Sequence, residues 1–486
     1  MTELTAPVHA LPLDITRVLL GGVLFFYFLE ALRHARDFSD PDGLIDHRLS
    51  IRLLPPTRLG LFQPGMPGWL FRAVFLAACI ASLLVVVGWH PRAAAGFMFV
   101  VAVSKYRWNV LVAYLDDAMM HTFCLWLALL PVGNTLVLPD LLAGSPAIRE
   151  WMSATVPGLT PRAFLANMAL VYLVAGLYKF TSPMWRDGSA MHAALRMPIA
   201  RAPAFWTFRY RTLLRLVTHA SLVAEPLFAL IFVLPAGSLA KWPLVGGAVV
   251  FHLGIALTLK IPYSNTAMLG PLALAFGPEI MHGGLGLPPL PEAGPVGLTP
   301  SGVAAVTLVA LLVITLASDI VATRTKLTER YTPRGWTNPA HALLWALGIF
   351  QSYRLFDWVD ARNYHVRFEV SRCAEAADRA GRTDAGQPVD PGEIFPPSMR
   401  HLLLQSYLIG NIWLKLGPER LEAVRRSLLV RHARRYARAH PDAGTIDVVA
   451  VVQRVTGDNL DLVRGERRPL MRFTCRGGEA VMHFTG

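Results

Sequence analysis

The chain has 486 residues, of which 53% are hydrophobic and only 16% are charged. That balance excludes an ordinary water-soluble globule and predicts a multi-pass protein of the cell (inner) membrane, with the lipid bilayer as its main partner. The net charge of +13 comes chiefly from arginine. Because no nucleic-acid motif or continuous basic tract accompanies this charge, we assign it to cytoplasmic loops facing anionic lipid and expect no nucleic-acid partner.

Apolar runs that suit a bilayer crossing of about 20 residues recur along the chain as far as residue 317. They cover residues 13–33, 70–89, 93–115, 118–132, 163–180, 213–234, 244–259 and 302–317. Two shorter runs, 266–277 and 340–353, have a length that also suits re-entrant or interfacial segments. We therefore predict an all-α polytopic membrane helical bundle with about nine spans, in a range of eight to ten. No small-residue cleavage site follows the first run, so we expect it to be a retained helix.

The last part of the chain is of mixed, soluble character and predicts a small α+β C-terminal domain. We place the boundary so that residues 1–355 form the transmembrane domain and 356–486 the C-terminal domain. Strands are expected at 364–373, 446–455 and 468–476, helices at 400–416 and 419–439, and a Gly-, Pro- and Asp-rich linker at 374–397. The arginines of the second helix predict a solvated or lipid-facing side of an amphipathic helix.

The distribution of charged residues gives conflicting indications of which side of the membrane each loop occupies. The positive-inside rule places the arginine-rich loop 321–336 in the cytoplasm, so a span at 340–353 would make the C-terminal domain extracytoplasmic, which is the placement we expect. The same rule also places the loops around Arg36 and Arg201 inside, whereas the family resemblance given below would place them outside. The sequence leaves this conflict open.

The chain has four cysteines, and none has CxxC or Cys/His metal spacing. Cys79 and Cys124 lie in apolar runs, where a thiol behaves as a small hydrophobe. Cys373 and Cys475 end expected strands, so either a disulfide between antiparallel neighbours or two unrelated thiols is compatible with the sequence.

Lys179 closes the apolar run that begins at Ala163 and is followed by Trp185 and Gly188. A charge at the edge of hydrocarbon is costly, which favours a functional site, and a buried lysine can lose its proton and act as a base. The alternative is a lysine that extends from the helix end to the headgroups. We expect Lys179 to be buried beside polar groups of other helices.

Further polar side chains lie within the apolar runs and predict a polar cavity, because hydrocarbon satisfies none of them. Asp117 and His121 are one helical turn apart and share a face. Asp117, His121, Glu225 and His252 should point into the bundle. No metal signature such as HExxH occurs, so no metal site is expected, and His34, His47 and His192 are interpreted as ordinary loop histidines.

Several stretches resemble the transmembrane domain shared by vitamin K-dependent gamma-carboxylase and its bacterial relatives, the HTTM (horizontally transferred transmembrane domain) family. The resemblance covers roughly residues 13–360. It rests on the segments 172–188 (YLVAGLYK, then Trp185 and Gly188), 105–117 (KYRWNVLVAYLDD), 251–263 with Met268, 40–44, Glu225-Pro226 and 351–357 (QSYRLFD).

The resemblance implies a base at Lys179, which in the carboxylase deprotonates vitamin K hydroquinone before oxygen converts the anion into a stronger base. The histidine that the carboxylase has near the start of its fourth helix falls here closest to Asp116 and Asp117, with His121 one turn later, so Asp117 and His121 are the further catalytic candidates. Asn109, Trp185, Glu225 and His252 are the candidate binding residues for a reduced quinone cofactor such as vitamin K hydroquinone. The chain departs from the animal enzyme in having too few residues after the membrane domain for its large protein-binding region. A quinone or other lipid-soluble substrate is therefore expected, with a non-catalytic peptide maturation or export factor as the alternative.

Overall fold

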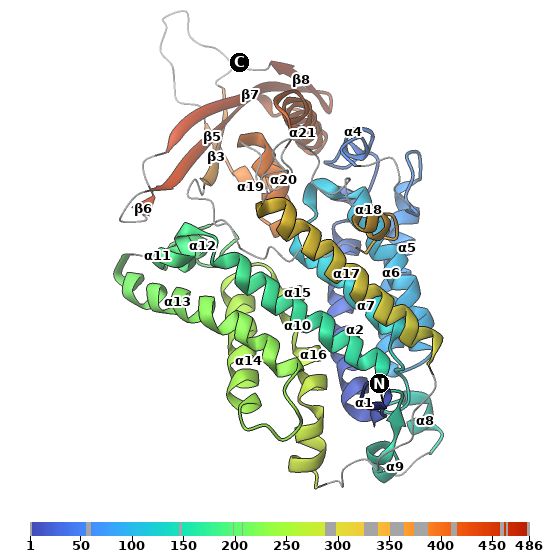
Figure 1. Cartoon of the computed structure of the whole chain (residues 1–486). Helices are drawn as coiled ribbons and strands as arrows, with labels where there is room; N and C mark the ends of the chain where they lie inside the picture. Colours follow the sequence, from blue (N-terminus) through green and yellow to red (C-terminus); the bar gives the residue numbers. More distant parts are fainter. Residues whose placement is uncertain are drawn as a thin grey trace, which may run out of the picture.

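The computed structural model describes residues 2–54, 60–144, 148–197, 199–206, 208–286, 298–324, 339–349, 364–373, 387–409, 416–456, 461–462 and 465–483. A bundle of long helices forms the first part of the chain, and a sheet with three helices forms the last (Figure 1). The expected helical bundle with a small C-terminal sheet region is confirmed. The expected boundary between residues 355 and 356 lies outside the described residues.

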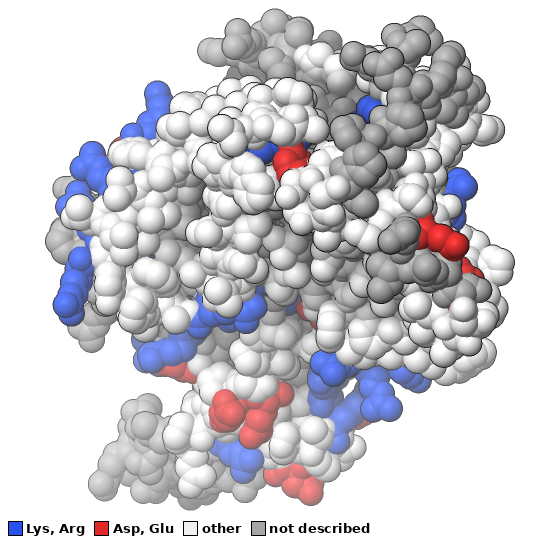
Figure 2. Space-filling model, turned by 90° about the horizontal axis from the view of Figure 1, so that it is seen from below, with Lys and Arg blue, Asp and Glu red and all other residues white. Residues whose placement is uncertain are grey.

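Among the described residues, six helices are long and apolar enough to cross a membrane. Large apolar side chains on them face outward, as on α14, where Leu257 is 73% exposed. On the face seen from below in Figure 2, most of the described surface is neither Lys, Arg, Asp nor Glu. These properties fit a membrane protein. The six are α2 (Ala10–Arg33), α5 (Gly68–Val87), α10 (Leu159–Lys179), α13 with the 3-10 turn after it (Arg211–Phe232), α14 (Lys241–Thr258) and α17 (Pro300–Arg324, with its apolar window at Pro300–Ala317).

The prediction of about nine spans is not confirmed by this set. The runs at 93–115 and 118–132 are helical, but α6 (Pro91–Trp108) carries Arg92, Lys105 and Arg107, and α7 (Leu115–Leu129) has 15 residues. The ambiguous run 266–277 falls on two short helices, α15 (Pro262–Ala267) and α16 (Leu269–Ala275), followed by a π-helical turn (Glu279–Gly284). The run at 340–353 contains α18 (Pro339–Ala346), which is too short to cross a bilayer by itself.

The core of the bundle lies where α2, α5, α7 and α10 meet, and aromatic side chains fill it. Phe28, Phe71, Phe75, Phe123 and Phe164 are fully buried there. Short elements connect the long helices: α1 (Thr2–Thr5), β1 (Val8–His9), α3 (Ala35–Phe38), α4 (His47–Ile51), a 3-10 turn (Val110–Val112), α8 (Leu138–Leu142), α9 (Ile148–Ser153), β2 (Thr155–Val156), α11 (Pro183–Asp187), α12 (Ala190–Arg196) and 3-10 turns at Phe208–Tyr210 and Phe228–Phe232.

The C-terminal part is an antiparallel sheet in the order β4-β3-β5-β7-β8, with β6 paired to β5. The α21 helix packs against β7 and β8 (Figure 1). The three expected strands and the expected helix 419–439 are confirmed. The expected helix 400–416 is confirmed as far as residue 409, and residues 410–415 lie outside the described residues. β4, β6 and β8 were not expected, and β4 and α19 occupy part of the expected linker 374–397. The elements are β3 (Tyr364–Arg372), β4 (Gln387–Val389), α19 (Pro391–Ile394), α20 (Met399–Ile409), α21 (Pro418–Ala439), β5 (Gly444–Thr456), β6 (Asp461–Leu462), β7 (Glu466–Arg476) and β8 (Glu479–His483).

Cys373 and Cys475 are free thiols. The possibility that they end neighbouring strands is wrong, because β5 lies between β3 and β7. Two strand spacings amount to about 9.5 Å, which exceeds the Cα separation that a disulfide spans. Cys373 instead donates its S–H to Asp447, at 3.0 Å.

Two arginines of α21, Arg431 and Arg435, form contacts with the membrane bundle, whereas the sequence predicted only a solvated or lipid-facing side. Arg431 donates to the carbonyls of Pro41 and Gly43, at 2.9 and 2.7 Å. Arg435 pairs with Asp37 at 2.5 Å. The helix therefore binds α3 and the turn that follows it, and these contacts attach the C-terminal part to the membrane bundle.

Candidate functional site

Lys179 is buried at the end of α10, with 3% of its surface exposed, and forms an ion pair with Glu225 of α13. Its ammonium also lies 5.1 Å from the centre of the Trp185 ring. The expectation that Lys179 is buried beside polar groups of other helices is confirmed. A structure in which it merely extends to lipid headgroups is excluded by this burial.

Two residues bring α10 and α13 close enough for this pair to form. Gly176 lies one turn before Lys179, and a Cβ there would sit 2.5 Å from Cδ of Pro226. Pro226 follows Glu225 within α13, and the helix then passes into the 3-10 turn Phe228–Phe232. Proline lacks the N–H that a continuous helix needs, which accounts for the change of helix type.

A small cavity of about 50 Å³ opens beside the Lys179–Glu225 pair. Its polar lining comes from Tyr172, Lys179, Glu225, His252, Ser264 and Asn265. Apolar walls complete it, formed by Met119, Val171, Phe251, Ile255 and Met268. Five elements meet there: α7, α10, α13, α14 and α15.

A hydrogen-bonded chain crosses the same cavity from α10 to α15. Tyr172 Oη lies 2.5 Å from His252 Nε2, and His252 Nδ1 lies 3.0 Å from Asn265 Oδ1. Asn265 Nδ2 donates to the carbonyl of Ile261 at 2.9 Å, which fixes the orientation of the amide. His252 therefore carries its proton on Nδ1 and accepts the Tyr172 hydroxyl at Nε2.

Asp116 holds α15 in place at this cavity. Its carboxylate accepts from the backbone N–H groups of Tyr263 and Ser264, at 3.2 and 3.0 Å, and from the Ser264 hydroxyl. These N–H groups belong to the first turn of α15, which has no partners for them within the helix. An acid of α7 thus caps a helix that is distant in sequence.

Asp117 belongs to a separate polar network. It accepts from Lys105 at 2.5 Å, from Tyr27 at 2.8 Å, from the Tyr114 backbone N–H at 3.0 Å and from Arg400 at 3.0 and 3.2 Å. Arg400 of α20 also pairs with Glu30 at 3.1 Å. A carboxylate with this many donors is placed to hold structure together.

His121 and Asn109 lie away from the cavity lining. His121 is buried with its ring 5.8 Å from that of Tyr106, and Asn109 donates to the Ser39 hydroxyl at 3.1 Å. The expectation that Asp117, His121, Glu225 and His252 point into the bundle is confirmed, since each is at most 7% exposed. Of the expected site residues, the structure brings together Lys179, Trp185, Glu225 and His252. It leaves Asp117, His121 and Asn109 outside this group.

Sequence reasoning missed Tyr172, Ser264 and Asn265 as site residues. Tyr172 lies in a segment that carries the family resemblance, whereas Ser264 and Asn265 directly follow another such segment, which ends at Tyr263. Arg400 was missed as a partner of Asp117 because the two residues are 283 positions apart and no local pattern links them.

The fold and the cavity define an integral membrane helical protein with a buried lysine–carboxylate pair at a polar pocket. Neither a protein-family model nor any curated protein or solved structure matches this chain.

Proposed function

We propose that this protein is a membrane enzyme of the vitamin K-dependent gamma-carboxylase-like (HTTM) type. In this proposal Lys179 removes the proton from an acidic hydroxyl of a lipid-soluble substrate, a reduced quinone. The observation that carries the proposal is the convergence of Lys179, Glu225 and the Tyr172–His252 pair on one cavity between apolar helices. A phenolic hydroxyl suits such a site, because it offers one proton and one oxygen to polar groups and an apolar ring to the walls.

The proton balance gives Glu225 a defined role. Transfer of one proton from Lys179 to Glu225 converts the ion pair into a neutral amine and a carboxylic acid, which a site of low dielectric tolerates. The amine then takes the hydroxyl proton of the substrate and becomes an ammonium again. The ammonium and the Trp185 ring beside it stay in place, so the new phenolate is paired with a cation while the proton remains on Glu225.

The present cavity must widen to admit a quinone ring. Its volume of about 50 Å³ holds water, whereas a cavity of roughly 150 Å³ is needed for a single benzene ring. The wall formed by Phe251 and Ile255 belongs to α14, and only 17% of the residues of this helix are buried inside the protein. This helix faces lipid over most of its surface, so side-chain movement on α14 provides the entry path from the bilayer.

Lys179→Arg tests the assignment of the base. Arginine keeps the charge but does not lose a proton at neutral pH. We expect oxygen-dependent consumption of a reduced quinone by the purified protein in lipid nanodiscs to fall by about 100-fold or more, the typical share of a general base. Loss of the hydroquinone, followed by chromatography, is the measurement.

Lys241→Arg is the matched control. Lys241 is equally buried and pairs with Glu279 at 3.0 Å, but it does not line the cavity. We expect its activity to stay within about threefold of the wild type. Equal activity of Lys179→Arg and the wild type would remove the base assignment. A wild-type protein that neither binds nor consumes reduced quinones would contradict the enzyme and favour a peptide factor instead.

A further inference from the structure

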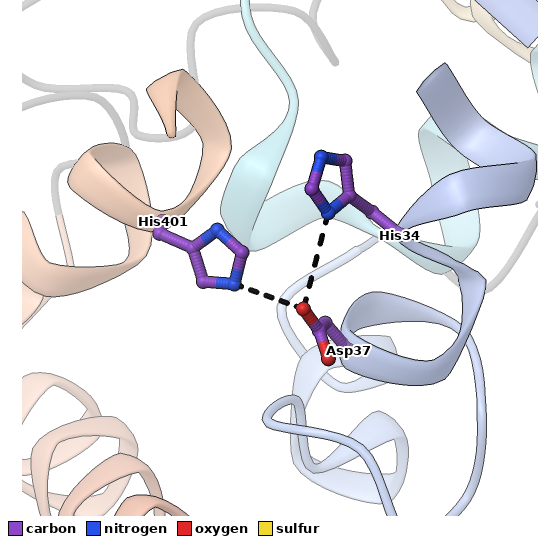
Figure 3. A group of neighbouring side chains, drawn as sticks. All are labelled: His34, Asp37 and His401. Atoms are coloured by element: carbon purple, nitrogen blue, oxygen red, sulfur yellow. Dashed lines mark hydrogen bonds and ion pairs between the residues drawn. The ribbon is translucent and has the colours of Figure 1, made fainter. Parts of the chain in front are cut away.

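Three side chains meet at the junction between the membrane bundle and the C-terminal part (Figure 3). His34 and Asp37 flank the start of α3, and His401 comes from the first turn of α20. Asp37 Oδ2 lies 3.1 Å from His401 Nε2 and 3.9 Å from His34 Nδ1. One donor atom from each residue lies within 4.8 Å of the others.

Neighbouring groups hold these donor atoms in position. The Ser398 hydroxyl bonds to His401 Nδ1 at 2.6 Å, which leaves Nε2 directed at Asp37. Arg435 Nη1 donates to Asp37 Oδ1 at 2.5 Å, which leaves Oδ2 for the two histidines. Outer partners of this kind orient the histidine and carboxylate ligands of metal sites.

We propose that His34, Asp37 and His401 form a binding site for a divalent transition-metal ion, with Zn²⁺ as the ion that fits best. Two imidazoles and one carboxylate are one of the donor sets of three-ligand zinc sites, which leave a fourth position for water, and the same set also binds iron(II). Tetrahedral ligands about 2.1 Å from zinc stand about 3.4 Å apart. The observed separations of 3.1 and 3.9 Å lie on either side of that value.

The surroundings allow an ion to enter and then enclose it. The His34 side chain is 30% exposed, whereas that of His401 is 1% exposed. Phe38 packs against His401, with ring centres 4.7 Å apart, and closes the inner side. The positive Arg435 disfavours a cation, but it neutralises the carboxylate oxygen that the metal would not use.

A bound ion would connect two parts of the chain that are far apart in sequence. His34 and Asp37 follow the first long helix, and His401 lies 364 residues beyond Asp37. The site is separate from the cavity at Lys179, since none of its three residues lines that cavity. This inference stands independently of the proposed function.

Metal binding can be measured on tag-free, full-length protein in detergent. After equilibration with Zn²⁺ and removal of unbound ion, elemental analysis is expected to give one Zn²⁺ per chain. His34→Ala and His401→Ala should each weaken Zn²⁺ binding by about 100-fold. His440→Ala is the matched control, because His440 also lies beside a carboxylate, Glu393, at 3.5 Å, but the described residues supply no third ligand group to this pair. It should bind Zn²⁺ as the wild type does.

Co²⁺ substitution of the wild-type protein gives a second readout that does not depend on any variant folding. We expect the visible absorption of a low-coordinate site with nitrogen and oxygen ligands, quenched by added Zn²⁺. An absence of Zn²⁺ and Co²⁺ binding in the wild type would overturn the proposal. So would unchanged stoichiometry and affinity in both His34→Ala and His401→Ala.

Discussion

Three buried lysines in the described bundle each pair with a carboxylate, and their surroundings separate structural from chemical roles. Lys105 pairs with Asp117 and Lys241 with Glu279, whereas Lys179 pairs with Glu225 at a cavity. Burial and charge pairing are common to all three. The feature that singles out Lys179 is its position in the lining of that cavity, to which neither Lys105 nor Lys241 contributes.

The burial of Lys179 could be predicted from the sequence, because an apolar helix delivers it and any charge in hydrocarbon needs a partner. Its partner could not be chosen, since several acids were equally available. Asp117, expected at the site on the family resemblance, instead binds Lys105 and Arg400. That choice depends on tertiary packing that no local spacing records.

His432 provides a test at a single residue of the C-terminal part. Burial lowers the pKa of His432 to about 4, and its Nδ1 donates to the carbonyl of Leu428. The folded state therefore favours the neutral ring. The contribution of the neutral His432 ring to the free energy of unfolding is therefore complete above the ordinary histidine pKa of about 6.5. This contribution is lost as the pH falls from 6.5 toward 4.

The expected loss is roughly 3 kcal/mol, from 1.36 kcal/mol for each pKa unit. His432→Asn keeps a donor near Nδ1 but cannot be protonated in this range. Thermal unfolding of the full chain should show a smaller drop in Tm between about pH 7.5 and 4.5 for the variant than for the wild type. Identical drops would show that His432 does not set this dependence.

At the scale of elements, the contact of α10 with α13 determines whether Lys179 reaches Glu225. Gly176→Ala would place a Cβ 2.5 Å from Pro226 Cδ and 2.7 Å from its backbone nitrogen. The helices must then separate. We expect a loss of about 1–3 kcal/mol in stability from overpacking, together with reduced quinol turnover.

Gly254→Ala on α14 is the control for this change. Nothing lies within 4 Å of a Cβ at Gly254, so the better helix propensity of alanine should raise stability by up to about 1 kcal/mol. Thermal unfolding in detergent compares the two variants. If Gly176→Ala were as stable and as active as Gly254→Ala, the close approach would have no role.

The long apolar helices could be predicted from hydropathy, because each consists of a nearly continuous run of apolar residues that is about as long as a bilayer crossing. The strands β3, β5 and β7 could be predicted from partial alternation of polar and apolar residues, whereas the shorter β4, β6 and β8 could not. The division of residues 262–284 into α15, α16 and a π-helical turn could not be predicted. The start of α15 involves capping by Asp116 of α7, a residue about 147 positions away that no local pattern connects to it.

At the scale of the whole molecule, Arg400 joins the two parts of the chain. Its guanidinium is 3% exposed and pairs with Asp117 and Glu30, at 3.0 and 3.1 Å. Arg400→Met would leave Glu30 without this partner and remove one of the two cations at Asp117. Breaking a buried pair in this way costs about 3–5 kcal/mol.

Faster hydrogen exchange in α20 and a lower Tm are the expected results for Arg400→Met. Arg472→Ala is the control, since Arg472 pairs with Asp447 on the exposed side of the sheet and such pairs contribute at most about 1 kcal/mol. Equal effects of the two substitutions would show that Arg400 does not attach the C-terminal part.

In the proposed function, a lipid-soluble quinone occupies the cavity beside Lys179. Organic extraction of protein purified from its native membrane, followed by mass spectrometry, measures it most directly. We expect about one quinone molecule per protein chain, both in the wild type and in the Lys241→Arg control. Val171→Trp fills the cavity and should abolish the bound quinone. No quinone in the wild type, or the same amount in Val171→Trp, would contradict the claim.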